Sequence, residues 1–591
     1  MNRDDRVPVA PAMQPLLDDV RIPVERALFD KRAVFIAAAG VVLAIVAGLV
    51  AQLLVALIHL VTNVAFYGRF SARPVSPAGN HLGWLVLLVP AAGGLIVGVM
   101  ARYGSKAIRG HGIPEAMEQV LLNESRIPLR VTFLKPLSAA ISIGTGGPFG
   151  AEGPIIATGG AMGSAVGQFV KMTAMERKTL LAAGAAAGMA ATFGSPVSAV
   201  LLAIELLLFE LRPRSIIAVS LAAVAAAAVR IGFVGYVPAF AMPAVQRPGE
   251  AALAIYAVLG AVVGALSVSV TRIVYSVEDL FEHLPVHWMW WPAIGGLAVG
   301  AIGIFAPRTL GVGYTNIEDL VSGRLVGGAA LLLCTMKFLS WAISLGSGTS
   351  GGTLAPLLTI GGGAGVVLGE VVNLAFPSLA LDLRICALVG MAAMFAGASR
   401  ALLASVVFAF ETTLQPLGLL PLLGGCTAGY LVSSLLMRNT IMTEKLARRG
   451  VRVPAEYAAD FLDLISVADA CSTDVVTVRA GEPIAALRAL AASHQGFPVV
   501  DDAGRLLGVV TRRDFLDPSH PESTRAADLI SRPPAVIFLD NSLREAADQM
   551  VRENVGRLPV VARDDTRRLA GFLTRSDLLE AHERRLQESD A

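Results

Sequence analysis

The sequence predicts an all-helical polytopic membrane protein that carries a small soluble α/β domain at its C-terminus. Of its 591 residues 54% are hydrophobic and 16% charged, and the mean hydropathy is +0.65, whereas soluble proteins carry about 25% charged residues. The charges are also uneven, because residues 451–591 hold 40 of the 94 charged side chains. We therefore expect an N-terminal tail at 1–32, a transmembrane domain at 33–450 and a soluble region after it.

The composition also excludes several classes of protein. The high hydrophobic content excludes a disordered chain, and a net charge of +2 gives no sign of a nucleic-acid partner. The four cysteines are far apart and form no CxxC motif, so neither a disulfide framework nor a zinc ribbon is indicated. The sequence shows no metal-ligand cluster, Ser/His/Asp set or phosphate loop, so we expect no enzymatic activity and no required cofactor.

The N-terminal region predicts how the chain enters the membrane. Residues 1–32 are charged and contain proline, without the apolar core of a cleavable signal peptide. Lys31 and Arg32 directly precede the first apolar run, a bias that favours a cytoplasmic N-terminus. We expect a multi-pass protein of the cell membrane with both termini in the cytoplasm.

The apolar runs differ in length. Five are long enough to cross a bilayer, which takes about 20 residues: 33–64, 81–103, 214–236, 250–275 and 289–306. The segments 113–122, 150–168 and 354–375 are short or contain several glycines, and we expect them to be broken helices. Broken helices at membrane depth are tolerated only inside the protein or along a cavity, so these segments indicate the site.

An internal repeat predicts two related halves. The 27 residues from Ile141 align without a gap with those from Ile343, at a shift of 202, and the matches include Pro154 with Pro356. At the same shift Lys135 falls on Lys337 and Gly188 on Gly390. Transporters are commonly built from such paired halves, and their binding site lies where the halves meet.

Three glycine–proline motifs predict an anion site. They are Gly110-His-Gly-Ile-Pro114, Gly150-Ala-Glu-Gly-Pro154 and Gly351-Gly-Thr-Leu-Ala-Pro356. Each is typical of a helix start, where backbone N–H groups are free and the helix dipole is positive. Any one of them is also compatible with a simple kink, but three such motifs together with the internal repeat favour convergence on a small anion.

These motifs resemble the GSGIP, GREGP and GxFxP signatures of the CLC family of chloride channels and transporters, over about residues 33–450. The resemblance implies the CLC fold, with two inverted-topology halves of broken and tilted helices, and a homodimer with one pore per subunit. It places the family's gating glutamate at Glu152. It implies that chloride binds at the following positions: His111, Gly112, Ile113, Gly150, Ala151, Gly153, Thr353, Leu354 and Met442.

Four positions depart from the family pattern. His111 replaces a serine, and its imidazole is able to donate to chloride, to titrate near neutral pH or to be satisfied by backbone. Leu354 replaces a phenylalanine and Met442 a tyrosine. Leu206 falls on the internal proton-relay glutamate, with Glu205 just before it.

These departures favour passive or weakly proton-coupled chloride movement. The alternative is a chloride/proton antiporter in which Glu205 or His111 supports a proton path to Glu152. Fluoride export, cation transport and a membrane-anchored nucleotide sensor are further alternatives. A cation path predicts several acidic residues, whereas the motifs contain one carboxylate among helix starts.

Three other charged residues lie in apolar surroundings. Lys135 and Lys337 precede the two main motifs, and a buried ammonium in a membrane is usually paired or functional. We expect them either to raise the potential along the anion path or to have a structural pairing. Glu411 is expected to be structural.

A second repeat lies in the soluble tail. Gly508-Val-Val-Thr511-Arg-Arg-Asp514 and Gly571-Phe-Leu-Thr574-Arg-Ser-Asp577 are shifted by 63 residues. The pattern of strand, helix, strand, strand and helix resembles a tandem pair of CBS domains, at 462–520 and 525–585. The resemblance implies that Thr511, Asp514, Thr574 and Asp577 contact an adenine nucleotide; the alternative is a dimerisation module without ligand. Phe497 and Ile537 are candidates for holding a base or for the core.

Overall fold

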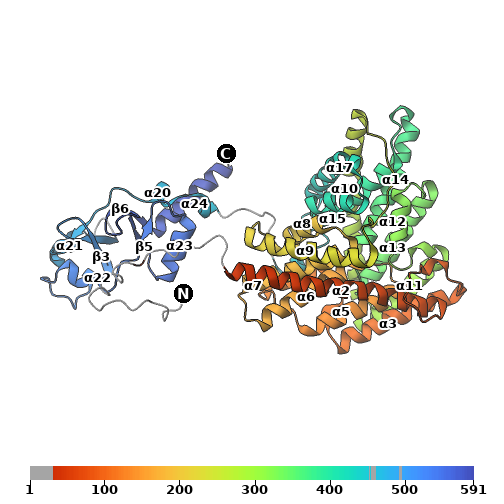
Figure 1. Cartoon of the computed structure of the whole chain (residues 1–591), viewed down its shortest axis with the longest axis horizontal. Coiled ribbons are helices and arrows are strands. Elements are labelled where there is room, and N and C mark those ends of the chain that lie inside the picture. Colours follow the sequence, from red (N-terminus) through yellow and green to blue (C-terminus); the bar gives the residue numbers. More distant parts are fainter. Residues whose placement is uncertain (1–20, 22–30, 452, 454–460, 491–494, 591) are drawn as a thin grey trace. The chain divides into compact units, whose positions relative to one another are not determined.

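The chain folds into two compact units, which are described separately. The structure is a computed structural model that describes all residues except 1–20, 22–30, 452, 454–460, 491–494 and 591 (Figure 1). One unit spans Leu28–Tyr457, and the other joins Met1–Ala27 with Ala458–Ala591. The first is helical and the second mixes helices with strands, which confirms the predicted fold class.

The helical unit has the same order of helices in each half of the repeat. The described part of the first half contains α2 (Lys31–Tyr67), α3 (Leu88–Tyr103), α4 (Ile113–Leu122), α5 (Leu129–Gly144), α6 (Glu152–Phe169), α7 (Ala174–Phe193), α8 (Pro196–Ala203) and α9 (Pro213–Val234). The second half contains α10 (Glu250–Glu282), α11 (Trp291–Phe305), α12 (Tyr314–Val321), α13 (Gly327–Gly346), α14 (Leu354–Ala375), α15 (Leu383–Ser399), α16 (Leu402–Thr413) and α17 (Leu419–Leu436), followed by α18 (Glu444–Arg448).

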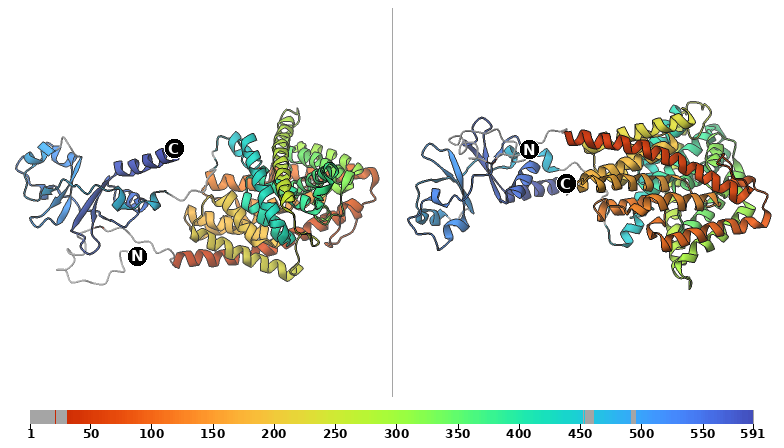
Figure 2. Two further views of the ribbon diagram at one scale, coloured as in Figure 1. Left: turned by 90° about the horizontal axis from the view of Figure 1, so that it is seen from above. Right: turned by 60° about the horizontal axis from the view of Figure 1, so that its bottom comes forward.

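Eight helical stretches among the described residues are long and apolar enough to cross a membrane. They include the five predicted spans, for example Lys31–Tyr67 and Glu250–Glu282. The 37-residue α2 packs along α5, α7 and α9 at the edge of the unit (Figure 2). The chain is therefore a multi-pass membrane protein.

The expectation of broken helices is wrong for two of the three segments. Both α6, with 18 residues, and α14, with 22, are continuous. Their glycines allow close packing of neighbouring helices instead. A Cβ atom added to Gly163 would lie 2.0 Å from the carbonyl oxygen of Leu180 on α7. A Cβ atom added to Gly365 would lie 2.1 Å from the carbonyl oxygen of Cys386 on α15. Glycine lets the backbones of membrane helices touch, and at these positions it does so without ending the helix. Of the three segments, α4 alone is short, with ten residues.

The second unit contains two copies of one α/β arrangement. In the first, β1 (Val478–Arg479), β2 (Gly496–Val500) and β3 (Leu506–Thr511) form a sheet in that order, with β1 parallel and β3 antiparallel to β2. The strands β4 (Ile537–Phe538), β5 (Arg557–Val561) and β6 (Leu569–Thr574) repeat this order and these directions. The helices are α19 (Phe461–Leu464), α20 (Val467–Ala470), α21 (Ile484–Leu490), α22 (Arg512–Leu516), α23 (Leu543–Arg552) and α24 (Arg575–Asp590).

Candidate anion site

The starts of α4, α6 and α14 meet inside the helical unit. The N–H of Gly150 donates to the carbonyl of Gly352 at 3.2 Å, and the N–H of Gly352 donates back at 2.9 Å. The N–H of Gly110 donates to the carbonyl of Thr349 at 3.0 Å. The loops that begin the three motifs are thus hydrogen-bonded to one another, although Gly110 and Thr349 are 239 residues apart in the sequence.

Glycine is required where these loops cross. An added Cβ on Gly153 would lie 1.9 Å from the His111 carbonyl oxygen, and one on Gly112 would lie 2.4 Å from that of Gly153. Gly112 also has a φ of +96°, a conformation that other residues rarely adopt. These contacts hold the first turns of α4 and α6 side by side, together with Ile113 and Ala151, which are both buried.

Glu152 lies at the centre of this arrangement and is fully buried. Its carboxylate turns back over the start of its own helix, next to Gly150 and Gly352. A Cβ atom added to Gly150 would lie 1.7 Å from Glu152 Oε2, and a Cβ atom added to Gly352 would lie 2.9 Å from the same oxygen. Oε1 accepts a hydrogen bond from the Tyr314 hydroxyl at 2.9 Å. Oε2 has no hydrogen-bond partner within the described chain. The carboxylate therefore occupies the space between the helix starts.

Other polar atoms at these helix starts also lack partners. His111 Nδ1 and Thr353 Oγ1 are buried and make no hydrogen bond in the part of the chain that the structure describes. Buried polar groups without partners are rare and call for a ligand, an ion or water. Leu354 and Met442 are both buried, and neither side chain has a hydroxyl group.

Tyr314 is a site residue that the motifs do not contain. It is the first residue of α12, 162 positions from Glu152. A signal for it exists in the sequence, because Gly311-Val-Gly-Tyr314 matches Gly110-His-Gly-Ile113 at a shift of 201. The start of α12 is thus the counterpart of the start of α4, and four helix starts rather than three surround Glu152. The Tyr314 ring also packs against Phe193 and Phe240.

Lys135 and Lys337 have the same structural pairing in the two halves. Lys135 Nζ donates to the carbonyls of Ile108 and Gly110, at 2.9 and 2.8 Å. Lys337 Nζ donates to those of Thr309 and Gly311, at the same two distances. Each ammonium therefore holds the loop that precedes a short helix, α4 in the first half and α12 in the second. Lys337 fixes the position of Tyr314 in this way.

Glu205 and Glu411 cap each other's helices. The Glu205 carboxylate accepts the backbone N–H groups of Leu403 and Ala404 at the start of α16, both at 3.0 Å. Glu411 accepts those of Val197 and Ser198 at the start of α8, at 3.0 and 2.8 Å. Glu205 thus has both oxygens on backbone donors, in a π-helical segment (Ile204–Leu208) that also contains the buried Leu206. Glu411 has the structural role expected for it.

The predicted nucleotide residues occupy equivalent places in the two α/β copies. The N–H and hydroxyl of Thr511 both donate to Asp514 Oδ2 at 2.7 Å, and the N–H of Thr574 donates to Asp577 Oδ2 at 2.7 Å. Both pairs stand where a strand ends and a helix begins. Phe497 and Ile537 are fully buried in the two cores, so of the two roles considered for them the core role holds.

Comparisons with known proteins identify both parts of the chain. A family model described as "Voltage gated chloride channel" matches residues 93–434, and the CBS domain model matches 467–519 and 526–584. The chain is 32% identical over 366 residues to "Chloride channel protein CLC-f" of Arabidopsis thaliana, a match that covers 57% of this chain and 46% of the plant protein. The matched region thus spans less than half of that relative.

Two further matches cover a larger share of the matched protein. The chain is 30% identical over 365 residues to "H(+)/Cl(-) exchange transporter ClcA" of Salmonella arizonae, covering 59% of this chain and 76% of the relative. Among solved structures, that of "a slow cyanobacterial Cl-/H+ antiporter" aligns with a TM-score of 0.62 and 26% identity, over 69% of this chain and 97% of the cyanobacterial chain.

Proposed function

Because this chain belongs to the voltage-gated chloride channel family, we propose that it moves chloride across a membrane through the site at the starts of α4, α6 and α14. The observation that carries the proposal is a group of buried polar atoms at these helix starts, on Glu152, His111 and Thr353, which have no hydrogen-bond partner among the residues that the structure describes. Helix N-termini supply N–H donors and a partial positive charge, which hold an anion without a full opposite charge. An anion bound in this way is able to leave again.

Glu152 is the gate in this proposal. Its ionised carboxylate lies over the start of α6 and competes with chloride for the same donors. When it takes up a proton or swings away from Gly150, the donors become available to chloride. Tyr314 favours the closed position, because its hydroxyl donates to Oε1.

We propose that transport is passive or only weakly coupled to protons. Leu206 has no titratable group. Both carboxylate oxygens of Glu205 accept hydrogen bonds from backbone N–H groups at the start of α16. The alternative is a chloride/proton antiporter, the activity named for the Salmonella relative and the cyanobacterial structure. In that case His111 or bridging water carries the proton between the cytoplasm and Glu152.

The test is chloride efflux from proteoliposomes with the external pH recorded. Chloride flux that drives no protons against the proton gradient supports passive transport. Proton uptake driven uphill by chloride exit establishes the antiporter instead. Efflux of fluoride but not chloride would overturn the choice of anion.

We also propose a homodimer with both termini in the cytoplasm. The cations at the ends of the helical unit support this orientation, with Lys31 and Arg32 at the start of α2 and Arg448 and Arg449 at the end of α18. Protease cleavage of the soluble region in inside-out vesicles, but not in right-side-out vesicles, tests the orientation. Single-molecule subunit counting tests the dimer.

A second candidate function is adenine-nucleotide sensing by the CBS pair. It is favoured by the equivalent geometry of Asp514 and Asp577, each of which bonds through Oδ2 and leaves Oδ1 without a hydrogen bond to the described chain. Calorimetry with ATP and ADP tests it on the full chain. Binding that weakens in Asp514→Ala or Asp577→Ala supports the proposal, and no binding to the wild type favours a module without ligand.

A further inference from the structure

An apolar groove of about 750 Å³ lies between α2, α5 and α6, away from the anion site. Phe35, Leu129 and Phe169 line one end of it, and they lie at the start of α2, the start of α5 and the end of α6. Three helix ends thus meet at its mouth. The groove continues along α2 to Val46.

The dimensions of the groove match one leaflet of a bilayer. From Phe35 to Val46 a helix rises about 16 Å, at 1.5 Å per residue. The hydrocarbon core of a bilayer is about 30 Å thick, so one leaflet measures about 15 Å. The walls are apolar except for Thr132, whose buried hydroxyl has no hydrogen-bond partner among the described residues. A single acyl chain would fill a groove of this length and polarity.

The mouth of the groove is positively charged. Three exposed cations stand at the three helix ends: Lys31 at the start of α2, Arg130 in the first turn of α5, and Lys171 just after α6. Their side chains make no hydrogen bond or ion pair with any residue that the structure describes. Lys31 lies four residues before Phe35, which places both on one face of α2.

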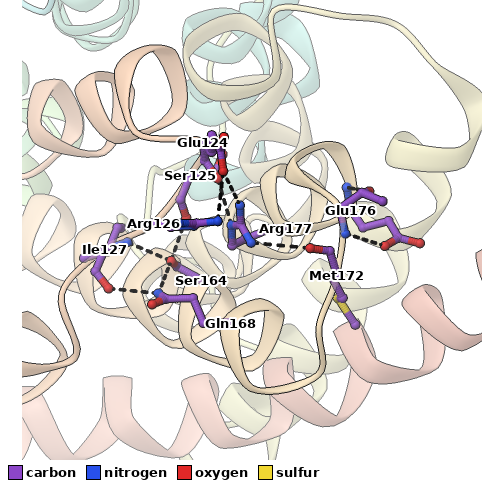
Figure 3. A network of polar contacts seen from close by, with 10 residues as sticks. Glu124, Ser125, Arg126, Ile127, Ser164, Gln168, Met172, Glu176 and Arg177 are labelled. Carbon is purple, nitrogen blue, oxygen red and sulfur yellow. Dashed lines mark hydrogen bonds and ion pairs between the residues drawn. The ribbon is translucent and has the colours of Figure 1, made fainter.

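Other charged residues near the mouth, within the part of the chain that the structure describes, are paired with one another. Arg177 donates to the carbonyls of Glu124 and Met172, at 2.8 and 3.4 Å, and pairs with the Glu124 carboxylate at 3.3 Å (Figure 3). Arg126 contacts the same carboxylate at 3.0 Å. Arg32 pairs with Glu176 at 2.7 Å.

Two polar side chains of α6 fix the start of α5 beside it. The Ile127 N–H donates to Ser164 Oγ at 2.8 Å, and Gln168 Nε2 donates to the Ile127 carbonyl at 3.1 Å (Figure 3). Ser164 in turn donates to the Ser125 carbonyl at 2.6 Å. These contacts hold the start of α5 in place. Among the described residues of the rim the acidic groups Glu124 and Glu176 are paired with arginines, whereas Lys31, Arg130 and Lys171 are not paired.

We propose that this groove binds one acyl chain of an anionic glycerophospholipid whose phosphate lies at Lys31, Arg130 and Lys171. An apolar groove one leaflet deep selects a lipid chain, and unpaired cations at its mouth select an anionic headgroup over a zwitterionic one. Basic residues at the ends of membrane helices attract anionic lipids in this way.

The test is a native mass spectrometry titration of the full-length protein in detergent. The probes are palmitoyl-oleoyl phosphatidylglycerol and palmitoyl-oleoyl phosphatidylcholine, with glycerol 3-phosphate as a soluble competitor. We expect retention of phosphatidylglycerol in preference to phosphatidylcholine, without displacement by glycerol 3-phosphate. The variant Lys31→Gln/Arg130→Gln/Lys171→Gln should weaken phosphatidylglycerol binding by about fivefold for each charge removed.

A second variant tests the groove itself. Ala38→Trp places an indole in the groove and should abolish retention of the lipid. The matched controls are Arg69→Gln, an exposed cation beyond the other end of α2, and Ala92→Trp, an exposed alanine on α3. Both should bind phosphatidylglycerol like the wild type.

Three results would overturn the proposal. Equal retention of the two phospholipids by the wild type excludes the anionic headgroup. Undiminished binding in Ala38→Trp excludes the groove. The third result combines two observations: the wild type retains no lipid, and Ala38→Trp changes the number of subunits. The groove would then be a contact with a second copy of the chain.

Discussion

The Tyr314 hydroxyl donates a hydrogen bond to Glu152 Oε1 at 2.9 Å and so connects the two halves of the repeat at the gate. Tyr314 begins α12, and Glu152 begins α6. Both residues stand at helix starts, and Lys337 positions the tyrosine through the carbonyls of Thr309 and Gly311. The closed position of the carboxylate thus depends on a residue in the other half of the chain.

Replacing Tyr314 by phenylalanine should increase chloride flux. The substitution keeps the aromatic packing and removes the only hydroxyl that bonds Glu152 among the described residues. A hydrogen bond to a charged group is worth about 1.5–3 kcal/mol, which is a factor of about 10 to 150 in the ratio of closed to open gate. We therefore expect flux to rise by about tenfold or more. Flux assays in proteoliposomes measure this. The control is Tyr67→Phe, because the Tyr67 hydroxyl donates to the Ser76 carbonyl, away from the site. A fall in flux in Tyr314→Phe would contradict the proposal that Tyr314 stabilises the closed position of Glu152.

Replacing Glu152 by glutamine should remove the pH dependence of transport while chloride flux persists. Glutamine has a similar shape but neither titrates nor competes with chloride as an anion. Flux measured across a series of pH values checks this. A pH response like that of the wild type would show that another group is the gate.

Glu205→Gln should lower stability without changing proton movement. Glutamine presents an NH₂ group to one of the two N–H donors at Leu403 and Ala404, and loss of a cap costs about 1–2 kcal/mol. Glu411→Gln is the matched variant, because its carboxylate makes the equivalent contact with α8. We expect both to lower the melting temperature by similar amounts. If Glu205→Gln alone alters proton flux, Glu205 is a relay residue.

Lys337→Met should destabilise the helical unit and disturb the gate. Methionine fills similar space but leaves the carbonyls of Thr309 and Gly311 without their donor, at a cost of about 1–3 kcal/mol for each buried group. Thermal unfolding should show a comparable loss for Lys135→Met. The gate should be disturbed only by Lys337→Met, because only Lys337 supports α12. The exposed Lys106, which contacts the Trp288 ring, provides the control Lys106→Met.

Much of the fold was predictable because its evidence is local or repeated. The hydropathy pattern gives the long helices, and the shift of 202 gives the paired halves. The three motifs predicted which helix starts come together, since each motif combines glycine with proline in a way that suits a helix start. The α/β repeat was predictable for the same reason.

The rest depends on contacts between distant residues. The match of Gly311-Val-Gly-Tyr314 to the first motif marks a helix start. It does not reveal that the Tyr314 hydroxyl reaches Glu152, because this contact depends on how α12 packs against α6. The cap made by Glu205 likewise depends on the place of α16. The glycines of α6 and α14 were misleading, since a glycine that breaks a helix and one that lets two helices touch look alike in a sequence.

The exchanged caps of α8 and α16 also bear on the origin of the chain from a duplicated segment. Glu205 in the first half satisfies backbone donors of the second, and Glu411 in the second satisfies those of the first. Neither segment by itself contains the carboxylate that its own helix start requires. We therefore expect either half expressed alone to expose a helix start whose capping carboxylate belongs to the other half.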